Sequence, residues 1–545
     1  MRKLLTVLVA TLVTGSLFAG GLVTNTNQSA AWVRMPARNA STSVDAAYYN
    51  PAGLMKLDNG FHFSLSNQTI FQTKEVENFY KGPGGLFGLN QSLYTGKVSA
   101  PLFPSVYAVY KLDRFAFSLG FNPIGGGGGA KYETGLPSFE LSASDLVPSL
   151  ASKGATAYRL DPYLEGTSVY LGFQGNVSFK INDWLSVAAG LRYVTAKNTY
   201  LGHLQDIEVN LSTGGWTRAD AIMTSIALSA KGGGDGLAPL ISGGLGSLTP
   251  AAAATAGYIT TAQRDQIVGG LTQLGVANAS ALTISQAQAT YYGAQAKYTA
   301  TATLLGDQEV DAEQTGSGIS PVFSVNFTPS ENLNIAVKYE MKTRMELVNK
   351  TSKDFLMGFT AEGNQITMFK DGDVTPSDMP ALLTFGLDYK LGSAAKISLG
   401  GNYYFDKNAD YGHKLDLDNV SSTPSTFVKN KDIMDHNGMS VQAGLELNIT
   451  DKLLVSGGWS YANKGVNAKY QSDLTYGLAT HTIGAGGAYK IMDNLLVNAG
   501  VSYTMYMDDE KTIDHVFSGT GALYQARETY AKRTLVVGVG VDFNF

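Results

Sequence analysis

The C-terminal stretch of the chain alternates strictly between apolar side chains and polar or small ones. Between Arg533 and the end, the apolar positions are Leu535, Val537, Val539, Val541, Phe543 and Phe545. The positions between them include Gly538, Gly540, Asp542 and Asn544. Because side chains in a β-strand point alternately to its two faces, this two-residue period predicts a strand with one apolar and one polar face.

The same alternation recurs along the rest of the chain. It is clearest in residues 115–121, 169–179, 185–193, 335–341, 397–405 and 497–505. The wall of a membrane barrel has this pattern, since apolar side chains face lipid and polar ones face the lumen. A strand of a soluble sandwich can alternate in the same way. The alternation alone therefore leaves both classes of β-protein open.

The lengths of the connections favour a barrel. Six short polar turns are expected at residues 111–114, 181–184, 328–332, 391–395, 450–452 and 492–494. They join twelve strands, and a first strand at 61–74 and a last at 532–545 make fourteen. The other connections are long: 75–103, 125–164, 200–316, 346–380, 408–437, 464–478 and 508–531. Short turns at one end and long loops at the other are typical of bacterial outer-membrane barrels. We predict an all-β fold, a 14-stranded antiparallel transmembrane β-barrel, over residues 58–545.

One connection is large enough to hold structure of its own. Residues 200–316 contain an Ala-rich stretch at 251–256 and helix-compatible stretches at 261–274 and 284–305. We interpret this insertion as a partly helical external cap. A separately folded binding domain is the alternative.

The N-terminus has the pattern of a secretory signal peptide. Arg2 and Lys3 precede a mostly apolar run from Leu4 to Phe18, and small residues follow it. We predict cleavage after residue 19, or as late as residue 21. The run is short for a membrane helix, and no cysteine follows it for lipid attachment. The mature chain is therefore expected to be exported through the inner membrane to the outer membrane of a Gram-negative bacterium.

The composition is consistent with an exported barrel. Charged residues make up 16% of the chain, which also has 62 glycines, 29 tyrosines and 24 phenylalanines. A net charge of −5 provides no basic field for nucleic acid. The absence of cysteine excludes thiol catalysis and disulfides. The six histidines lack metal-ligand spacing. His62 and His481 are the best candidates for the histidine of a hydrolase site, and they form no recognisable catalytic motif. We therefore expect no enzyme, no metal and no cofactor.

About forty residues, 20–57, precede the first strand and lack strand alternation. They contain the sequence Asn-Pro-Ala-Gly at Asn50, Pro51, Ala52 and Gly53. These residues favour a turn, because Pro restricts φ and Asn and Gly accept unusual backbone angles. We infer a compact segment, with a free periplasmic tail as the alternative. A fourteen-strand lumen is wide enough to leak unless something plugs it.

The segment also carries a family resemblance. It contains Asn39-Ala-Ser41, Asp45-Ala46 and Tyr49-Asn-Pro-Ala-Gly53 directly before the first strand. With these motifs, the fourteen strands and the terminal Phe545, the chain resembles the FadL/TodX-type outer-membrane transport family, which takes up long-chain fatty acids and aromatic hydrocarbons. The resemblance implies that residues 20–57 form a hatch inside the barrel, with Asn50, Pro51 and Ala52 at its core.

The resemblance further implies a break in the third strand that opens a lateral path through the wall. That strand, expected at residues 114–122, runs into Asn122, Pro123 and a glycine run that includes Gly125 and Gly126. Pro cannot donate to a ladder, and Gly weakens strand pairing, so an opening here is physically reasonable. A flexible loop that starts just beyond the strand is the alternative.

Candidate ligand contacts fall into three groups, of which the first two are apolar loop residues and lumen cations. Leu136, Phe139 and Leu141 are apolar residues of a long external connection and are expected to capture ligand, unless they only pack within the loop. Arg192 and Lys338 face the lumen by alternation and can pair with a ligand carboxylate. A salt network of the lumen, with Glu340 or Asp388, is the alternative.

Three tyrosines, Tyr107, Tyr170 and Tyr404, also face inward by alternation and are expected to line the passage. The resulting hypothesis is a monomeric channel for passive uptake of hydrophobic small molecules. Its expected partners are the ligand, outer-membrane lipid and lipopolysaccharide, and the barrel assembly machinery, with no nucleic acid. Two other functions fit the pattern: a general porin for polar solutes, and a surface adhesion or structural protein that acts through residues 200–316.

Overall fold

The computed structural model describes residues 24–85, 88–360, 363–410, 430–517 and 520–545. The predicted signal peptide and residues 20–23 of the predicted hatch lie outside the described residues. Among the helices that are described, none is both long and apolar enough to cross a membrane.

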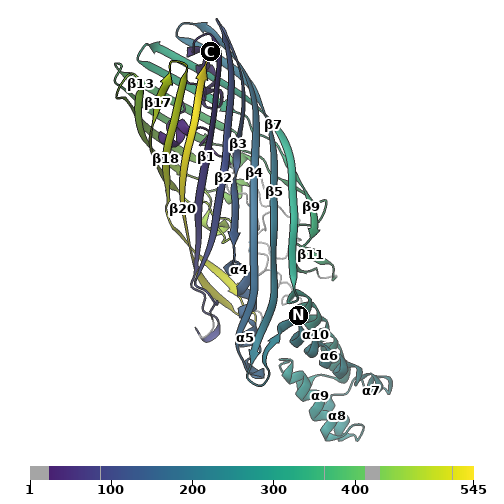
Figure 1. Cartoon of the computed structure of the whole chain (residues 1–545). Coiled ribbons are helices and arrows are strands. Elements are labelled where there is room, and N and C mark those ends of the chain that lie inside the picture. The colour runs from purple at the N-terminus through teal and green to yellow at the C-terminus, as the bar shows by residue number, and fades with distance from the viewer. Residues whose placement is uncertain (1–23, 86–87, 361–362, 411–429, 518–519) are drawn as a thin grey trace.

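The wall is a closed antiparallel barrel of fourteen spans (Figure 1). Eleven spans are single strands: β1 (Gly60–Asn78), β2 (Leu93–Leu112), β3 (Phe115–Tyr132), β4 (Ala155–Asn182), β5 (Leu185–Leu211), β7 (Gln308–Ser330), β14 (Ala395–Tyr404), β15 (Met439–Asn448), β16 (Leu453–Asn463), β17 (Thr480–Met492) and β20 (Leu523–Asn544). Three are divided: β8 (Leu333–Glu340) with β9 (Glu346–Lys353), β12 (Val374–Pro376) with β13 (Leu382–Leu391), and β18 (Leu495–Tyr506) with β19 (Asp509–Val516). The barrel closes because β1 pairs with both β2 and β20. The predicted fold class is confirmed.

The alternation of side chains places apolar groups on the outside of this wall. On β1, Phe61, Phe63 and Leu65 are exposed, whereas His62 and Ser64 between them are buried. On β20, Leu535, Val537, Val539 and Val541 are exposed in the same way. Without lipid these side chains would face water, so the outer surface is suited to a bilayer.

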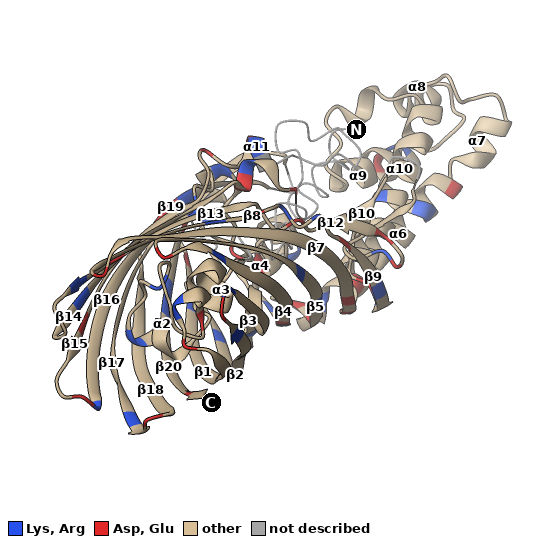
Figure 2. Cartoon of the chain, turned by 90° about the horizontal axis from the view of Figure 1, so that it is seen from above, with Lys and Arg blue, Asp and Glu red and all other residues tan. Residues whose placement is uncertain are grey.

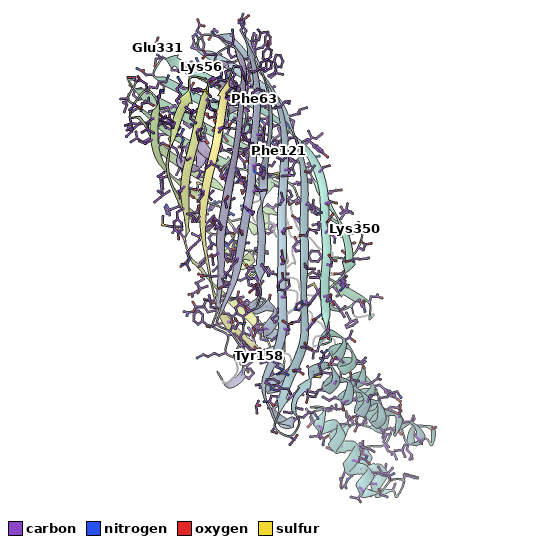
Figure 3. All side chains as sticks on the ribbon, viewed as in Figure 1. Lys56, Phe63, Phe121, Tyr158, Glu331 and Lys350 are labelled. Atoms are coloured by element: carbon purple, nitrogen blue, oxygen red, sulfur yellow. The ribbon has the colours of Figure 1, made fainter. Side chains whose placement is uncertain are left out.

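All six predicted short turns are present and lie at one end of the barrel, the short-turn end. Phe63 lies toward this end, and Tyr158 lies at the opposite, loop end (Figure 3). Several strands run further into the predicted long connections than expected. The connection predicted at 125–164 spans only 133–154, because β4 begins at Ala155. Toward the loop end, outward side chains such as Arg159 and Glu208 are charged. The strands therefore extend beyond the region in which outward side chains are apolar, and the alternation does not reveal this part of them.

The insertion is likewise shorter than predicted, because β5 continues to Leu211 and β7 begins at Gln308. Beyond the short β6 (Gly215–Arg218) it forms α6 (Ala219–Asp235), α7 (Ala238–Ser242), α8 (Pro250–Thr255), α9 (Thr261–Gln273) and α10 (Ile284–Leu304). The helices have their own core, which includes Leu271, Ile284 and Tyr291. They project to one side of the loop end (Figures 1 and 2) instead of lying across it as a cap.

Residues 24–57, called here the N-terminal segment, lie inside the barrel (Figure 2). The segment contains α2 (Ala30–Arg34), α3 (Ala46–Tyr49) and the 3-10 helix η1 (Pro51–Lys56). Glycines on the inner face of the wall allow its backbone to approach closely. A Cβ at Gly500 would lie 2.7 Å from the Arg34 nitrogen, and one at Gly386 would lie 2.4 Å from the Ala40 nitrogen. The small inward residues therefore make room for the segment.

Candidate functional site

A cavity of about 430 Å³ lies between the N-terminal segment and the loop end. Part of its wall is apolar and comes mainly from β1 to β4: Ile70, Val98, Ala100, Phe103, Ala130, Tyr132 and Leu164. A polar part includes Thr480, Thr482, Thr504, Tyr506 and Thr534 of β17, β18 and β20. Residues 24–27 and Trp32 of the N-terminal segment also line it. Its size and mixed lining are typical of a site for a small organic molecule.

The wall has a gap beside this cavity. β2 pairs with β3 from Leu112 to Val106 and again at Lys97 and Gly96, but not between Val106 and Lys97. The facing stretch of β3, residues 122–130, is equally without partners on β2. Pro101 and Pro104 lie on the β2 side and Pro123 on the β3 side. Proline lacks the N–H that a ladder needs, so both strands lose donors at the same level.

Side chains of β1 bind the β2 backbone at the gap. The Asn67 amide donates to the Pro101 carbonyl oxygen at 3.1 Å and accepts from the Phe103 N–H at 2.9 Å. The Thr69 hydroxyl also donates to the Pro101 oxygen. These bonds compensate for part of the missing ladder. The gap is therefore a defined feature of the wall and not a frayed edge.

The N-terminal segment binds the other side of the gap. The Asn25 N–H donates to the Ile124 carbonyl oxygen at 2.8 Å, and Thr24 forms an isolated antiparallel bridge with Gly125. The Gln28 amide donates to the Pro123 oxygen at 2.9 Å and accepts from the Asn122 amide at 2.8 Å. Three of the residues predicted for a lateral opening, Asn122, Pro123 and Gly125, thus contact the segment that occupies the lumen.

Gly126, the fourth of these residues, is the site of a backbone kink. Its φ is +96°, and a Cβ there would lie 2.2 Å from the Ser168 carbonyl oxygen of β4. The Asn25 amide donates to the Gly126 oxygen at 3.2 Å. Only glycine accepts this conformation without strain. If a flexible loop began here, β3 would end at residue 122. Instead, β3 continues as an irregular strand to Tyr132.

The Asn-Pro-Ala-Gly motif contacts β4, β5 and β7, the strands that follow β3 in the wall, nearer the short turns. The Asn50 amide donates to Asn326 Oδ1 at 2.7 Å and to the Ser41 carbonyl oxygen at 3.1 Å. Ser178 donates to the Pro51 oxygen, and Ser186 to the Ala52 oxygen. The Ala52 N–H donates to Ser324 Oγ at 2.7 Å.

Gly53 completes this motif, because a Cβ there would lie 2.3 Å from Asn50 Nδ2 and 2.6 Å from the Ser41 oxygen. A larger residue would displace the amide that binds the wall. The four residues of the motif therefore form one contact surface between the N-terminal segment and the barrel.

A buried ion pair holds the segment together. Arg38 donates to both carboxylate oxygens of Asp45, at 2.8 and 3.1 Å, and Asp45 also accepts from Ser41 and Ser29. Burial by itself would raise the pKa of Asp45. The charge of Arg38 and the donated hydrogen bonds outweigh burial and hold that pKa below its usual value. The carboxylate is therefore ionised throughout the neutral range.

Arg192 and Lys338 both bind Glu340 instead of facing the cavity. The nearest contacts are 2.5 Å from each cation to a Glu340 oxygen, and all three side chains are buried. Both cations also lie over the ring of Tyr48 in the N-terminal segment, at 5.0 and 4.5 Å from its centroid. The Lys338 ammonium donates to the Tyr48 carbonyl oxygen. These ion pairs form a salt network in the lumen, the alternative to a carboxylate-binding site at Arg192 and Lys338.

The three predicted tyrosines occupy different environments. Tyr404 lines the cavity. Tyr107 donates to the Gln28 carbonyl oxygen at 2.7 Å, beside the gap. Tyr170 is hydrogen-bonded to Ser377. The structure therefore brings only Tyr404 to the cavity wall.

The predicted capture residues pack within the loop end. Leu136 is buried in a cluster with Tyr94, Tyr132 and Tyr530, and Phe139 packs against the same cluster. Leu141, in helix α4 (Pro137–Ser144), is buried with Tyr80 and Ala526. None of the three lines the cavity described here.

Three lysines of the cavity wall were not predicted: Lys74, Lys464 and Lys532. For two of them, strand alternation in the sequence indicates an inward-facing side chain. Lys74 shares its strand face with the inward residues Gln72 and Ile70, and Lys532 shares its face with Thr534. Lys464 follows β16 in a loop, where alternation gives no direction.

No protein-family model matches the chain, and no curated protein matches it by sequence. Its structure is similar to solved structures. A Pseudomonas aeruginosa FadL homologue is 12% identical over 96% of this chain and 100% of its own, with a TM-score of 0.57. The P. putida toluene transporter TodX is 12% identical over 92% of this chain and 94% of its own, with a TM-score of 0.46. The first likeness confirms the predicted resemblance at the level of the fold.

Proposed function

We propose that this protein is an outer-membrane channel through which hydrophobic small molecules diffuse inward without an energy source. The observation that carries the proposal is the position of the cavity. Val98, Ala100 and Phe103 on one edge of the wall gap, and Gly126, Gly127 and Ala130 on the other, all line it. A ligand in the cavity is therefore next to an interruption of the wall, beyond which lies lipid.

The outer surface and the lumen support this function together. The apolar band outside suits a bilayer, and the mixed cavity inside offers an apolar solute an environment that water does not. The FadL homologue shares this fold. Long-chain fatty acids and aromatic hydrocarbons are the ligand classes that the family resemblance implies.

The N-terminal segment acts in this proposal as a hatch. It fills the lumen on the short-turn side of the cavity and binds β3 at the gap through Asn25 and Gln28. A shift of the segment would remove those bonds and free the backbone of β3. Release toward the periplasm and release through the wall therefore both depend on the same small set of contacts.

The experiment compares two substitutions of glycine by tryptophan. Gly127 lines the cavity, and a Cβ there meets no atom within 4 Å. Gly293, in α10, is equally unobstructed but lies far from the cavity. Uptake of radiolabelled oleate and of toluene is measured in cells that lack other routes. We expect Gly127→Trp to lower uptake about tenfold and Gly293→Trp to leave it unchanged.

Equal uptake by the wild type and a strain without the gene would contradict the proposal. Conductance in planar bilayers separates the channel from a general porin. With the N-terminal segment in place we expect little ion flow, and deletion of residues 24–57 should raise it strongly. A wild-type pore that is already open would favour a porin for polar solutes.

A further inference from the structure

A broad groove lies on the outer surface of the wall, across β1 to β5 and β7, toward the short-turn end where Phe63 lies (Figure 3). Its volume is about 1010 Å³, at the upper limit of the range usual for ligand pockets. The large exposed side chains that line it are all apolar or aromatic: Phe61, Phe63, Tyr110, Phe117, Leu119, Val177, Leu191 and Phe323. The groove thus belongs to the apolar band and is separate from the cavity in the lumen.

Small outward residues between bulky ones form this groove. The small residues are Ala108, Gly175 and Ala189. Across the ladders, Gly175 pairs with Leu119 on one side and Leu191 on the other, and Ala108 pairs with Phe63 and Leu119. A Cβ at Gly175 would meet no atom closer than 3.6 Å. The floor of the groove is therefore open to an occupant from outside the barrel.

The position of the groove limits that occupant to a molecule of the bilayer. Lipid tails are as apolar as the wall, so an apolar surface by itself does not select one lipid. A depression does, because atoms that line an unfilled space lose dispersion contacts, and an acyl chain that follows the shape restores them. The groove thus favours one seated lipid over the average lipid at the wall.

A cation with a fixed position lies at the short-turn end of the groove. Arg114, in the turn between β2 and β3, has its guanidinium over the ring of Phe179, 5.1 Å from the centroid. Its Nε and Nη2 donate to the Lys180 carbonyl oxygen, at 3.1 and 3.0 Å, and Nη2 also donates to the Ile181 oxygen at 2.7 Å. The ring and the two carbonyl groups hold the exposed guanidinium against the outer wall.

Arg114 has no carboxylate partner in the described part of the chain. No Asp or Glu oxygen of those residues lies within 4 Å of its guanidinium, and its Nη1 makes no hydrogen bond to them. The neighbouring Lys180, in contrast, is paired with Asp183 at 2.6 Å. A guanidinium binds phosphate oxygens through charge-assisted hydrogen bonds. Arg114 is therefore available for a phosphate at the surface of the bilayer.

The spacing between the cation and the groove matches a phospholipid. Phe179, which lies under the guanidinium, is two residues from Val177 in the groove. A strand rises about 3.3 Å per residue, so this step is roughly 7 Å. A glycerol backbone spans such a step, with its phosphate at Arg114 and its acyl chains in the groove. Short turns of bacterial barrels lie in the periplasm, so the lipid belongs to the periplasmic leaflet.

We propose that the groove and Arg114 form a binding site for one glycerophospholipid of the periplasmic leaflet. Arg114 binds the phosphate, and Ala108, Gly175 and Ala189 make room for the acyl chains. The site does not depend on the proposed channel function, because it lies on the outer surface of the wall. A protein that transported nothing would still bind this lipid.

The head-group test uses purified protein in an uncharged detergent, with bound lipid counted by native mass spectrometry. The probes are dioleoyl phosphatidylethanolamine, dioleoyl phosphatidylglycerol and dioleoylglycerol, which has the same chains and no phosphate. We expect both phospholipids to bind at least about tenfold more tightly than dioleoylglycerol. Arg114→Gln should abolish this difference. Lys452→Gln, at an exposed cation of another short turn, is the control and should preserve it.

The groove is tested by filling it. Gly175→Phe places a ring on its floor, and Gly457→Phe is the matched control on the outward face of β16, where a Cβ meets no atom closer than 3.5 Å. We expect Gly175→Phe to weaken binding of both phospholipids at least about tenfold and Gly457→Phe to leave it unchanged. Circular dichroism checks that each variant is folded. If Gly175→Phe is not, Ala189→Leu fills the groove one row nearer the short turns.

Four results would overturn the site. Equal binding of dioleoylglycerol and the phospholipids to the wild type would show that no phosphate is recognised. Full phospholipid binding in folded Gly175→Phe or Ala189→Leu would place the lipid elsewhere on the wall. Tighter binding of lipid A than of either phospholipid would assign the site to the outer leaflet. A wild-type dimer that Gly175→Phe converts to a monomer, measured by light scattering, would make the groove an interface between two copies.

Discussion

The side-chain amide of Gln28 donates to the carbonyl oxygen of Pro123 at 2.9 Å, and through this bond the lumen segment is tied to the irregular strand of the wall. Gln28 is fully buried. Pro123 lies where β3 loses its pairing with β2. Two features that could have been independent, a plug and an interrupted wall, therefore share hydrogen bonds.

Substitution of Gln28 by alanine is expected to loosen this junction. It removes the donor to Pro123 and the acceptor for the Asn122 amide, and each buried polar group left unpaired costs roughly 1–3 kcal/mol. Hydrogen exchange measured by mass spectrometry should speed up in peptides that cover residues 24–35 and 114–132. Gln205→Ala, at a partly exposed position of β5, is the control and should change neither peptide. Unchanged exchange in Gln28→Ala would show that the junction does not depend on this amide.

Gly126 and Gly127 provide an adjacent matched pair. An alanine at 126 must adopt a positive φ and places its Cβ against Ser168, whereas an alanine at 127 meets open space. We expect Gly126→Ala to destabilise the barrel by about 1–3 kcal/mol and Gly127→Ala to have little effect. Guanidinium unfolding in detergent micelles measures both. Similar stability of the two variants would mean that the kink at 126 is not required.

Asp45 is expected to be essential for the closed state of the lumen. Asp45→Asn leaves the buried Arg38 charge without its partner, a loss of roughly 3–5 kcal/mol for buried pairs. The segment should then occupy the lumen less completely, and ion conductance in planar bilayers should rise. Asp235→Asn breaks an exposed pair with Lys231 in α6 and should leave conductance unchanged. If Asp45→Asn stays closed, the pair does not hold the segment in place.

The same pair gives a pH dependence with a definite sign. The pKa of Asp45 is lowered in the folded state, so its contribution to stability is present above its unfolded pKa of about 3.9. That contribution is lost as the pH falls through the lowered pKa. Wild-type conductance should therefore stay low at neutral pH and begin to rise only below about pH 4. An opening transition near pH 6 would point to a different titrating group.

The bond between Asn50 and Asn326 allows the motif contact to be measured by a double-mutant cycle. Each single alanine substitution should destabilise the protein, and the two together should cost less than their sum by about 1 kcal/mol. Guanidinium unfolding of the four proteins gives the coupling. Asn50→Ala combined with Asn364→Ala, at an exposed loop position, should be additive. Additivity of the Asn50 and Asn326 substitutions would mean that their bond contributes nothing measurable.

The period of two residues was sufficient to predict the wall. It identified which side chains face lipid, as at Phe61 and Phe63, and with the sorted turn lengths it led to the correct number of spans. This works because burial in lipid constrains every second residue locally. Where the strands extend beyond the apolar band, as at Arg159, outward residues are charged, and the pattern predicts their ends too early.

The site depended on relationships that alternation does not encode. Strand alternation alone predicts that four cations lie on the inner face: Arg192, Lys338, Lys74 and Lys532. It does not predict which of them contacts a carboxylate. Glu340 neutralises the first two because β8 places it between them, whereas the other two meet only where β20 closes against β1. The unpaired edges at Pro104 and Pro123 likewise oppose one another through the register of β2 and β3. The sequence by itself determined which face each strand residue takes, because lipid and lumen select it residue by residue. Only the tertiary structure decided which charges and which edges meet, because closure and register set those contacts across the whole barrel.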